Sequence, residues 1–508
     1  MEFTSADIIK LQCALVAFLV VVPFLVAFAR HDQWRRRALM VGFIFLPTLG
    51  TAPFLGIIKS NFTLMSVEHY RGHTTGFTIG LQDIIGVALL IALYLSRHRH
   101  HFRLIPPGMI YFLIFYLAIS LSIFQAPVTE YSLMAMWNFG RMFLYYTVIY
   151  NFIRGSGDLR TVLWSIALCL FFQCLISLKM RYLNGVHQVP GTFDHQNSMA
   201  SWAYFCGLPM LALGLSQQAR RLDTAVYLAA YACAGMLAVL SISRGALLVF
   251  ACGSLLIVIH AILQKPTLKR VLLIGAGFAC GSFVLLVSLD SILGRFVGSN
   301  DYDKKHNLRI VLEEISHEML ADNPHGVGLN NYNVVNSRPY TEYSAMLERW
   351  NERRGYWFPD EYYERNPNTE NLYWMFLAET GYVGFAGLVI FLAYSLFVSI
   401  RCYLPYRRTL QGSFMLGLIV TLGLFYLHSQ LERVFTQPIN MMMFVMCIAL
   451  VARYDREHRR EMVPTLFRLW KLNQAYWDTA GRRAAPPRQT GIGSPEPSPA
   501  GSPTPTAA

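Results

Sequence analysis

The sequence has few charged residues for its length, and this scarcity excludes a soluble globular protein. Charged residues make up 14% of the 508 residues and hydrophobic residues 54%, whereas soluble domains contain about 25% charged residues. Apolar runs recur through most of the chain, and runs of about 18 residues or more can cross a hydrocarbon core about 30 Å thick. Because backbone groups in lipid must bond to one another, these runs predict transmembrane helices.

Cysteine is scarce wherever a polar site would use it. Of the nine cysteines, all except Cys402 fall within apolar runs, where cysteine is a small core residue. The longest polar segment, 290–370, contains no cysteine, which excludes a disulfide framework or a thiolate metal site there. The predicted outward loops contain no cluster of Asp, Glu and His at ligand spacing, and His69 with His73 is the nearest approach to a pair. We therefore predict neither a metal nor another cofactor.

The apolar runs predict an all-α polytopic membrane protein with about 12 to 13 transmembrane helices. Hydropathy places the spans near residues 7–29, 38–58, 78–95, 108–125, 134–153, 160–179, 197–215, 224–241, 246–263, 271–289, 373–400, 411–428 and 434–452.

Basic residues account for the net charge of +13, and they collect in alternate loops between the predicted spans. The positive-inside rule assigns such loops to the cytoplasm, which places the N-terminus outside and the C-terminus inside. A nucleic-acid partner is not predicted, because no recognition fold accompanies the charge. The basic loops are 30–37, 96–103, 154–160, 217–223, 264–270, 401–408 and 453–460.

One large polar segment interrupts the spans and is predicted to face outward as a loop subdomain. Within it, 309–320 and 341–355 have the spacing of amphipathic helices. The predicted parts of the chain are an N-terminal transmembrane bundle (1–289), the loop subdomain (290–372), C-terminal transmembrane helices (373–452), a cytoplasmic interfacial segment of basic and aromatic residues (453–481) and a disordered tail (482–508).

Polar and charged residues at the outward ends of the spans are the candidates for chemistry, because ionisable groups at membrane depth are costly. The alternative for any one of them is a snorkelling side chain that binds lipid headgroups. Arg244 fits that alternative poorly, since it lies in a connection of only a few residues between two apolar runs. The candidates are Arg71, His195, Asn197, Arg244, Arg309, Glu370, Asn371, Glu432 and Arg433.

Four short motifs on the predicted outward side together resemble the O-antigen ligase and polymerase family. They are SISRG (241–245), DNPHGVGLNNY (322–332), TENLYWMFLAETGYVGFAG (369–387) and PGTFDHQNS (190–198), the last being similar to the family's Gly-x-Phe-x-x-x-Asn stretch. The resemblance covers roughly residues 70–450 and lies in the order, spacing and shared sidedness of the motifs.

The resemblance implies a metal-independent membrane glycosyltransferase of the C-type class in a bacterial cytoplasmic membrane, with its active face periplasmic or extracellular. Its partners would be membrane lipids, a glycan donor linked to undecaprenyl diphosphate, and a hydroxyl acceptor on a glycan or on a lipid-linked molecule. An O-antigen ligase of lipopolysaccharide biosynthesis and a polysaccharide polymerase of exopolysaccharide biosynthesis both remain open.

Under this resemblance, Arg244 and Arg309 are the catalytic arginines, because guanidinium groups suit the charge that a leaving diphosphate gains. Glu370 is the candidate general base for the acceptor hydroxyl. Family ligases have a His-Asn pair where this sequence has Glu370 and Asn371, which puts transfer to a lipid A core in doubt and favours polymerisation. Glu370 as a cap of the following helix is the alternative. The predicted substrate-binding residues are Arg71, His195, Asn197, Asn371 and Arg433.

A polysaccharide transporter or flippase is the alternative from another functional class. Transporters commonly contain internal repeats and broken helices at the membrane midplane. The sequence has no evident repeat, and its polar residues gather at one face. This distribution favours an enzyme.

Overall fold

The computed structural model describes residues 5–49, 61–96, 102–275, 299–349 and 368–459, apart from short gaps at 68–69, 71, 265, 269, 273, 338–341, 344 and 348. The chain divides into two compact units, Met1–Arg456 and Glu457–Ala508, and almost all of the described residues belong to the first. The predicted disordered tail (482–508) lies outside the described residues, as do most of the predicted interfacial segment (453–481), almost all of the predicted span 271–289 and the end of the helix predicted at 341–355.

Helices dominate the described part of the chain. Six of them are long and apolar enough to cross a membrane, and three shorter apolar helices accompany them. The helices are α1 (Ser5–His31), α2 (Gln33–Phe45), α3 (Leu81–Tyr94), α4 (Met109–Ser120), α5 (Thr129–Phe152), α6 (Ser156–Leu178), α7 (Gln196–Gly214), α8 (Arg221–Ser241), α9 (Arg244–Gln264), α12 (Ser299–Asp322), α13 (Tyr332–Asn336), α15 (Leu372–Tyr406), α16 (Leu410–His428) and a final helix, Pro438–Arg459.

The predicted all-α polytopic fold is confirmed, and most predicted spans coincide with a helix to within a few residues. Local sequence explains several helix starts. Asp32, Asn371 and Thr409 each precede a helix, and their side chains accept hydrogen bonds from its first free backbone N–H groups. The helix predicted at 309–320 is the second half of α12, which begins ten residues earlier at Ser299.

A β-hairpin replaces part of the outer loop expected between the second and third spans. Strand β1 (Asn61–Ser66) pairs antiparallel with β2 (Gly76–Gly80), with a bulge between Thr63 and Met65. The span predicted to begin at residue 78 is wrong at that end, because 78–80 belong to β2 and the helix begins at Leu81. Threonine, phenylalanine and isoleucine in GFTIG favour a strand, and the Trp137 indole donates a hydrogen bond to the carbonyl of Thr78.

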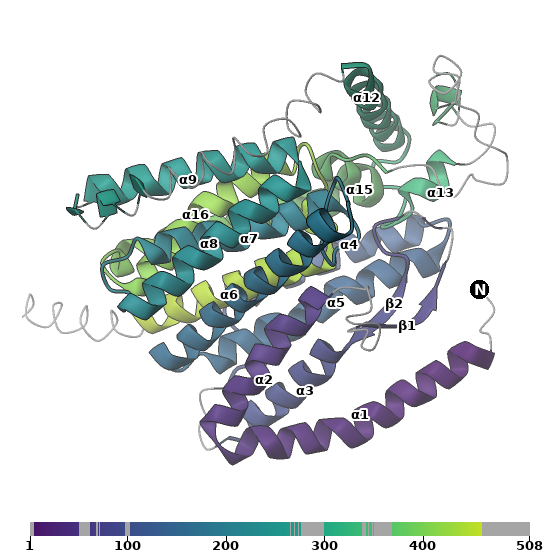
Figure 1. Ribbon diagram of the computed structural model, residues 1–508. Coiled ribbons are helices and arrows are strands. Elements are labelled where there is room, and N and C mark those ends of the chain that lie inside the picture. Colours follow the sequence, from purple (N-terminus) through teal and green to yellow (C-terminus); the bar gives the residue numbers. More distant parts are fainter. Residues whose placement is uncertain are drawn as a thin grey trace, which may run out of the picture. The chain divides into compact units, whose positions relative to one another are not determined.

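Described residues of several basic loops lie together at one end of the helices, as the predicted alternation requires. Arg37 pairs with Asp158 at 3.0 Å, Arg160 with Asp223 at 2.7 Å, and Arg401 with Asp455 at 2.6 Å. Each pair joins loops or helix ends that the sequence assigned to the same side. Figure 1 shows β1, β2, α12 and α13 at the opposite end of the helices.

Two of the motifs pack against each other through glycine. Helix α15 is kinked at Gly381, whose φ of 63° is left-handed, and the kink frees the carbonyls of Ala378 and Glu379. These carbonyls accept hydrogen bonds of 2.9 Å from the N–H groups of Val327 and Gly328. A Cβ on Gly326 would lie 2.4 Å from the Glu379 carbonyl oxygen, so only glycine permits this approach. The motifs DNPHGVGLNNY and LAETG therefore form one structural unit.

Candidate active site

Four of the candidate side chains meet at the end of the helices that carries α12. We call Arg309, Glu370, Glu432 and Asn197 the Arg309 cluster. The Arg309 guanidinium forms an ion pair with Glu370 and a second one with Glu432, where the nitrogen and oxygen are 3.2 Å apart. The Asn197 side-chain amide donates a hydrogen bond of 2.6 Å to the same Glu432 oxygen.

Each member of the Arg309 cluster comes from a different segment of the chain. Arg309 lies on α12, Glu370 two residues before α15, and Asn197 in the first turn of α7. Glu432 lies in the connection that follows α16, where its N–H donates to the carbonyl of His428. The N–H of Leu372 donates to the Ser429 carbonyl at 2.9 Å, which ties this connection to the start of α15. The cluster is therefore assembled only by the tertiary fold.

The two carboxylates of the cluster differ in their access to solvent. The Glu370 side chain is 43% exposed, and that of Glu432 is 16% exposed. Burial, together with the negative charge of Glu370, raises the pKa of Glu432 from 4.5 to about 7, although Arg309 and Arg433 oppose the shift. A partly enclosed carboxylate with this pKa exchanges a proton near neutral pH.

The raised pKa predicts how Glu432 affects stability. A folded-state pKa above the unfolded value means that the folded protein binds the proton more tightly, so stability from this group falls as pH rises from about 4.5 to about 7. Glu432→Gln mimics the protonated form at every pH. We expect wild type and Glu432→Gln to unfold at similar temperatures near pH 5, and wild type to unfold at the lower temperature near pH 8, measured by thermal unfolding in detergent.

The comparison with the variant is needed because other buried groups titrate in the opposite sense. Burial, with the nearby charge of Arg433, lowers the pKa of His73 to about 3, which makes stability rise with pH. A difference between wild type and Glu432→Gln that stays constant from pH 5 to pH 8 would contradict the enclosure of Glu432.

Arg433 follows Glu432 and adds a second guanidinium beside the cluster. Burial lowers its pKa, while the charges of Glu370, Glu379 and Glu432 act in the opposite direction. Among the residues that the structure describes, its buried Nη1 atom has no hydrogen-bond partner. A buried cationic donor without a partner is suited to an anionic ligand.

Arg244 is the first residue of α9 and lies beside the end of α16. Helix α8 ends at Ser241, and Ile242 turns the chain with a φ of 54°, a conformation that β-branched residues rarely adopt. Gly245, the residue after Arg244, packs closely on His428. A Cβ on Gly245 would lie 2.7 Å from the His428 Nε2 atom. His428 lies four residues before Glu432, so the tight turn brings the start of α9 to the segment that carries the cluster.

Two other predicted residues, Asn371 and His195, cap helices near the cluster. Asn371 caps α15 through Oδ1, and its amide donates to Glu313 on α12 at 3.2 Å. His195 caps α7, since its Nδ1 accepts from the Asn197 N–H at 3.2 Å. Arg71 lies outside the described residues. The helix-capping role first considered for Glu370 falls to Asn371 in the structure.

Two residues next to the site were not predicted from the sequence. Glu379 is buried in α15, and its carboxylate accepts hydrogen bonds from the N–H groups of Asn330 (2.9 Å) and Tyr332 (3.3 Å). His73 precedes β2, with its Nδ1 3.7 Å from the Glu379 carboxylate. A carboxylate inside an apolar run was the available signal for Glu379. The sequence gives no comparable signal for His73, because no residue near it in the chain indicates that it is buried.

Part of the chain matches the model of a known protein family. Residues 229–389 match the model of the O-antigen ligase family, and this range contains Arg244, Arg309, Glu370 and Asn371. The protein is a multi-pass membrane protein with a glycan ligase-like or polymerase-like role. Residues 229–389 are thus similar to the O-antigen ligase family. No curated protein matches the chain.

Proposed function

We propose that the protein transfers a glycan from undecaprenyl diphosphate to a hydroxyl acceptor at the outer face of a bacterial cytoplasmic membrane. The observation that supports this most is the Arg309 cluster, in which a guanidinium and two carboxylates meet at one end of the helices. Two of its four residues, Arg309 and Glu370, lie in the segment that matches the O-antigen ligase family.

In the proposed reaction, the acceptor oxygen forms a bond to the anomeric carbon of the donor. The bond between that carbon and the diphosphate oxygen breaks, and its electron pair leaves with undecaprenyl diphosphate. The acceptor proton passes to a carboxylate. Arg309, Arg433 and Arg244 are proposed to bind the diphosphate as its charge increases, so that no metal is required for charge neutralisation.

Glu370 remains our candidate for the base, because it combines contact with Arg309 and access for an acceptor. Its side chain is 43% exposed, whereas Glu432 is more enclosed and is already bonded to Asn197 and Arg309. We propose that Glu432 orients Arg309 and that Glu370 accepts the proton. His195, Asn197 and Asn371 would position the substrates, as would Arg71.

The function is tested by mass analysis of lipid-linked glycans in a strain that lacks the gene. We expect undecaprenyl-diphosphate-linked glycan to accumulate, and wild-type protein to remove the accumulation. A variant with Arg309→Ala is expected to insert normally and leave the accumulation in place. A deletion strain with an unchanged pool of lipid-linked glycan would contradict the proposal.

The proposed orientation is tested by labelling single cysteines from outside. Asn184 and Ser156 are both exposed. Ser156 is the first residue of α6, and Asn184 lies in the connection that follows the opposite end of this helix. In a background without the native cysteines, we expect Asn184→Cys to react with a membrane-impermeant maleimide in intact cells. Ser156→Cys should react only after permeabilisation. The reverse pattern would place the Arg309 cluster on the cytoplasmic side and contradict the proposed sidedness.

A further inference from the structure

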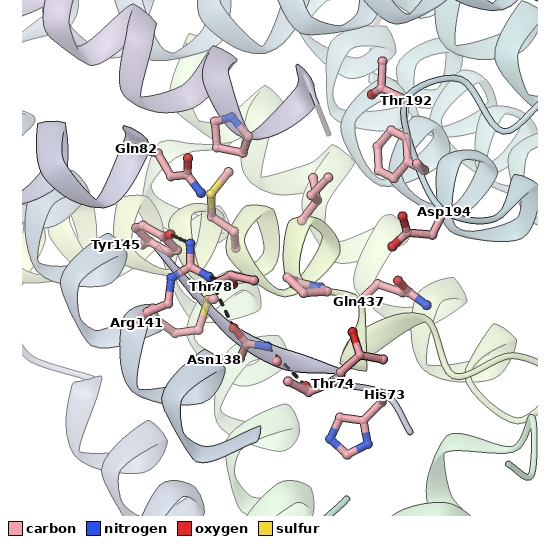
Figure 2. A pocket seen from close by; sticks show the side chains of 18 residues that line it. His73, Thr74, Thr78, Gln82, Asn138, Arg141, Tyr145, Thr192, Asp194 and Gln437 are labelled. Carbon is pink, nitrogen blue, oxygen red and sulfur yellow. Dashed lines mark hydrogen bonds between the residues drawn. The ribbon is translucent and has the colours of Figure 1, made fainter. Parts of the chain in front are cut away.

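A polar cavity lies beside the Arg309 cluster, between β2, α5 and the start of α7. Its volume is about 170 Å³. Figure 2 shows Arg141, Asn138 and Thr74 joined by hydrogen bonds along one part of its lining, with Asp194 and Gln437 drawn away from Arg141. The size is suited to a single small ring.

The lining of the cavity is rich in neutral hydrogen-bonding groups. The Asn138 amide donates to the Thr74 hydroxyl at 3.2 Å, and Arg141 donates to Asn138 at 3.3 Å and to Thr78 at 3.2 Å. Gln437 supplies a further amide. Hydroxyls and amides that both donate and accept match the hydroxyl groups of a sugar.

The charges at the cavity disfavour an anionic ligand. The Arg141 guanidinium is matched by Asp83, with nitrogen to oxygen distances of 2.7 Å and 3.0 Å. Asp194 adds another carboxylate to the lining. A diphosphate therefore finds better partners at Arg309 and Arg433, while the cavity is suited to a neutral group.

One lining residue is buried without a hydrogen-bond partner. The His73 side chain is 3% exposed, and within the described part of the protein neither of its ring nitrogens is hydrogen-bonded. Burying a polar group without such a bond costs free energy. An unpartnered side chain of this kind in a cavity lining is expected where a ligand supplies the missing partner.

Two segments connect the cavity to the Arg309 cluster. The segment 192–197 lines the cavity with Thr192 and Asp194 and then supplies Asn197 to the cluster. The segment 432–437 begins at Glu432 of the cluster and ends at Gln437 in the lining. A ligand bound in the cavity would therefore lie next to the residues that we propose to act on the diphosphate and on the acceptor.

We propose that this cavity is a subsite for one neutral sugar ring of the substrate glycan, recognised by His73, Thr74, Asn138 and Gln437. The inference rests on the proposed function, since it adds the sugar-binding part of that site. The ring belongs either to the donor or to the acceptor, and the chemistry of recognition is the same for both.

Binding is tested without turnover, on the full-length protein in nanodiscs. The probes are methyl glycosides of neutral hexoses and N-acetylhexosamines, with methyl glucuronide as the anionic match, observed by saturation-transfer NMR. We expect the neutral glycosides to bind and the glucuronide to bind more weakly. His73→Phe and Thr74→Val should each weaken binding by about 3- to 10-fold, as for the loss of one hydrogen bond.

Controls separate binding from folding. Thr161→Val makes the same chemical change as Thr74→Val at a hydroxyl that bonds only within α6, to the Gly157 carbonyl, and should leave binding unchanged. His73→Phe removes two unpartnered nitrogens and keeps a ring, so its thermal stability should equal or exceed that of wild type. Absence of binding by every neutral glycoside, stronger binding of the glucuronide, or wild-type binding in both cavity variants would overturn the proposal.

Steady-state transfer then assigns the ring to a substrate. A raised KM of His73→Phe for the lipid-linked donor places the donor sugar in the cavity, and a raised KM for the acceptor places the acceptor sugar there. If the protein binds glycosides but transfers no glycan, the proposed function is contradicted while the sugar subsite is still supported. Normal transfer by wild type with unchanged KM values in His73→Phe would overturn the subsite alone.

Discussion

Glu370→Gln is expected to lower the turnover of glycan transfer by about 10²- to 10⁴-fold, the usual effect of losing a general base. The amide keeps the size of the side chain and can still contact Arg309, but it cannot take the acceptor proton. Purified lipid-linked glycan and acceptor in nanodiscs provide the measurement, with product separated by chromatography. The KM for the donor should change little, because the diphosphate is proposed to bind the arginines.

Two companion variants make the Glu370 result specific. Glu314→Gln removes an exposed carboxylate from the same helix as Arg309 and should retain wild-type turnover. Glu370→His introduces the histidine that the resemblance to the family's ligases implies at this position. Its turnover should be higher than that of Glu370→Gln. Wild-type turnover in Glu370→Gln together with a large loss in Glu432→Gln would transfer the role of base to Glu432.

Arg309→Lys is expected to lower kcat/KM by about 10²- to 10³-fold, similar to the removal of one donor from a site of developing negative charge. Lysine keeps the positive charge but loses the planar fork that contacts Glu370 and Glu432 while binding an anion. Initial rates over a range of donor concentrations in nanodiscs give this value.

Arg181→Lys is the matched control for Arg309→Lys. Arg181 contacts the carbonyls of Val186 and His187 within its own loop, so the same substitution there should leave kcat/KM unchanged. Equal effects of the two substitutions would show that general charge, rather than the geometry at Arg309, governs the rate.

The sequence predicts the helices well, because a membrane span is specified locally by its own apolar residues. The run 373–400 lies within α15, and the run 411–428 almost coincides with α16. The kink at Gly381 could not be predicted in this way. It depends on hydrogen bonds from Val327 and Gly328, which lie more than 50 residues earlier in the chain.

The candidate site was predictable as a set of residues but not as a geometry. Arg309, Glu370 and Asn197 were identified from their type and position near span ends, and the structure brings them together at Glu432. Nothing local in the sequence indicates that Glu432 is the carboxylate that Arg309 and Asn197 share. The burial of His73 was equally hidden, since it results from the hairpin packing beside Glu379.

We propose that the Arg309 cluster breaks the bond between glycan and undecaprenyl diphosphate. The most direct test is to incubate the purified protein in nanodiscs with labelled lipid-linked glycan and a hydroxyl acceptor, and to quantify both products. We expect free undecaprenyl diphosphate and extended acceptor to appear in equal amounts, with neither formed by Arg309→Ala. Intact lipid-linked glycan moved across a vesicle membrane, with no undecaprenyl diphosphate released, would contradict a transferase and indicate a flippase.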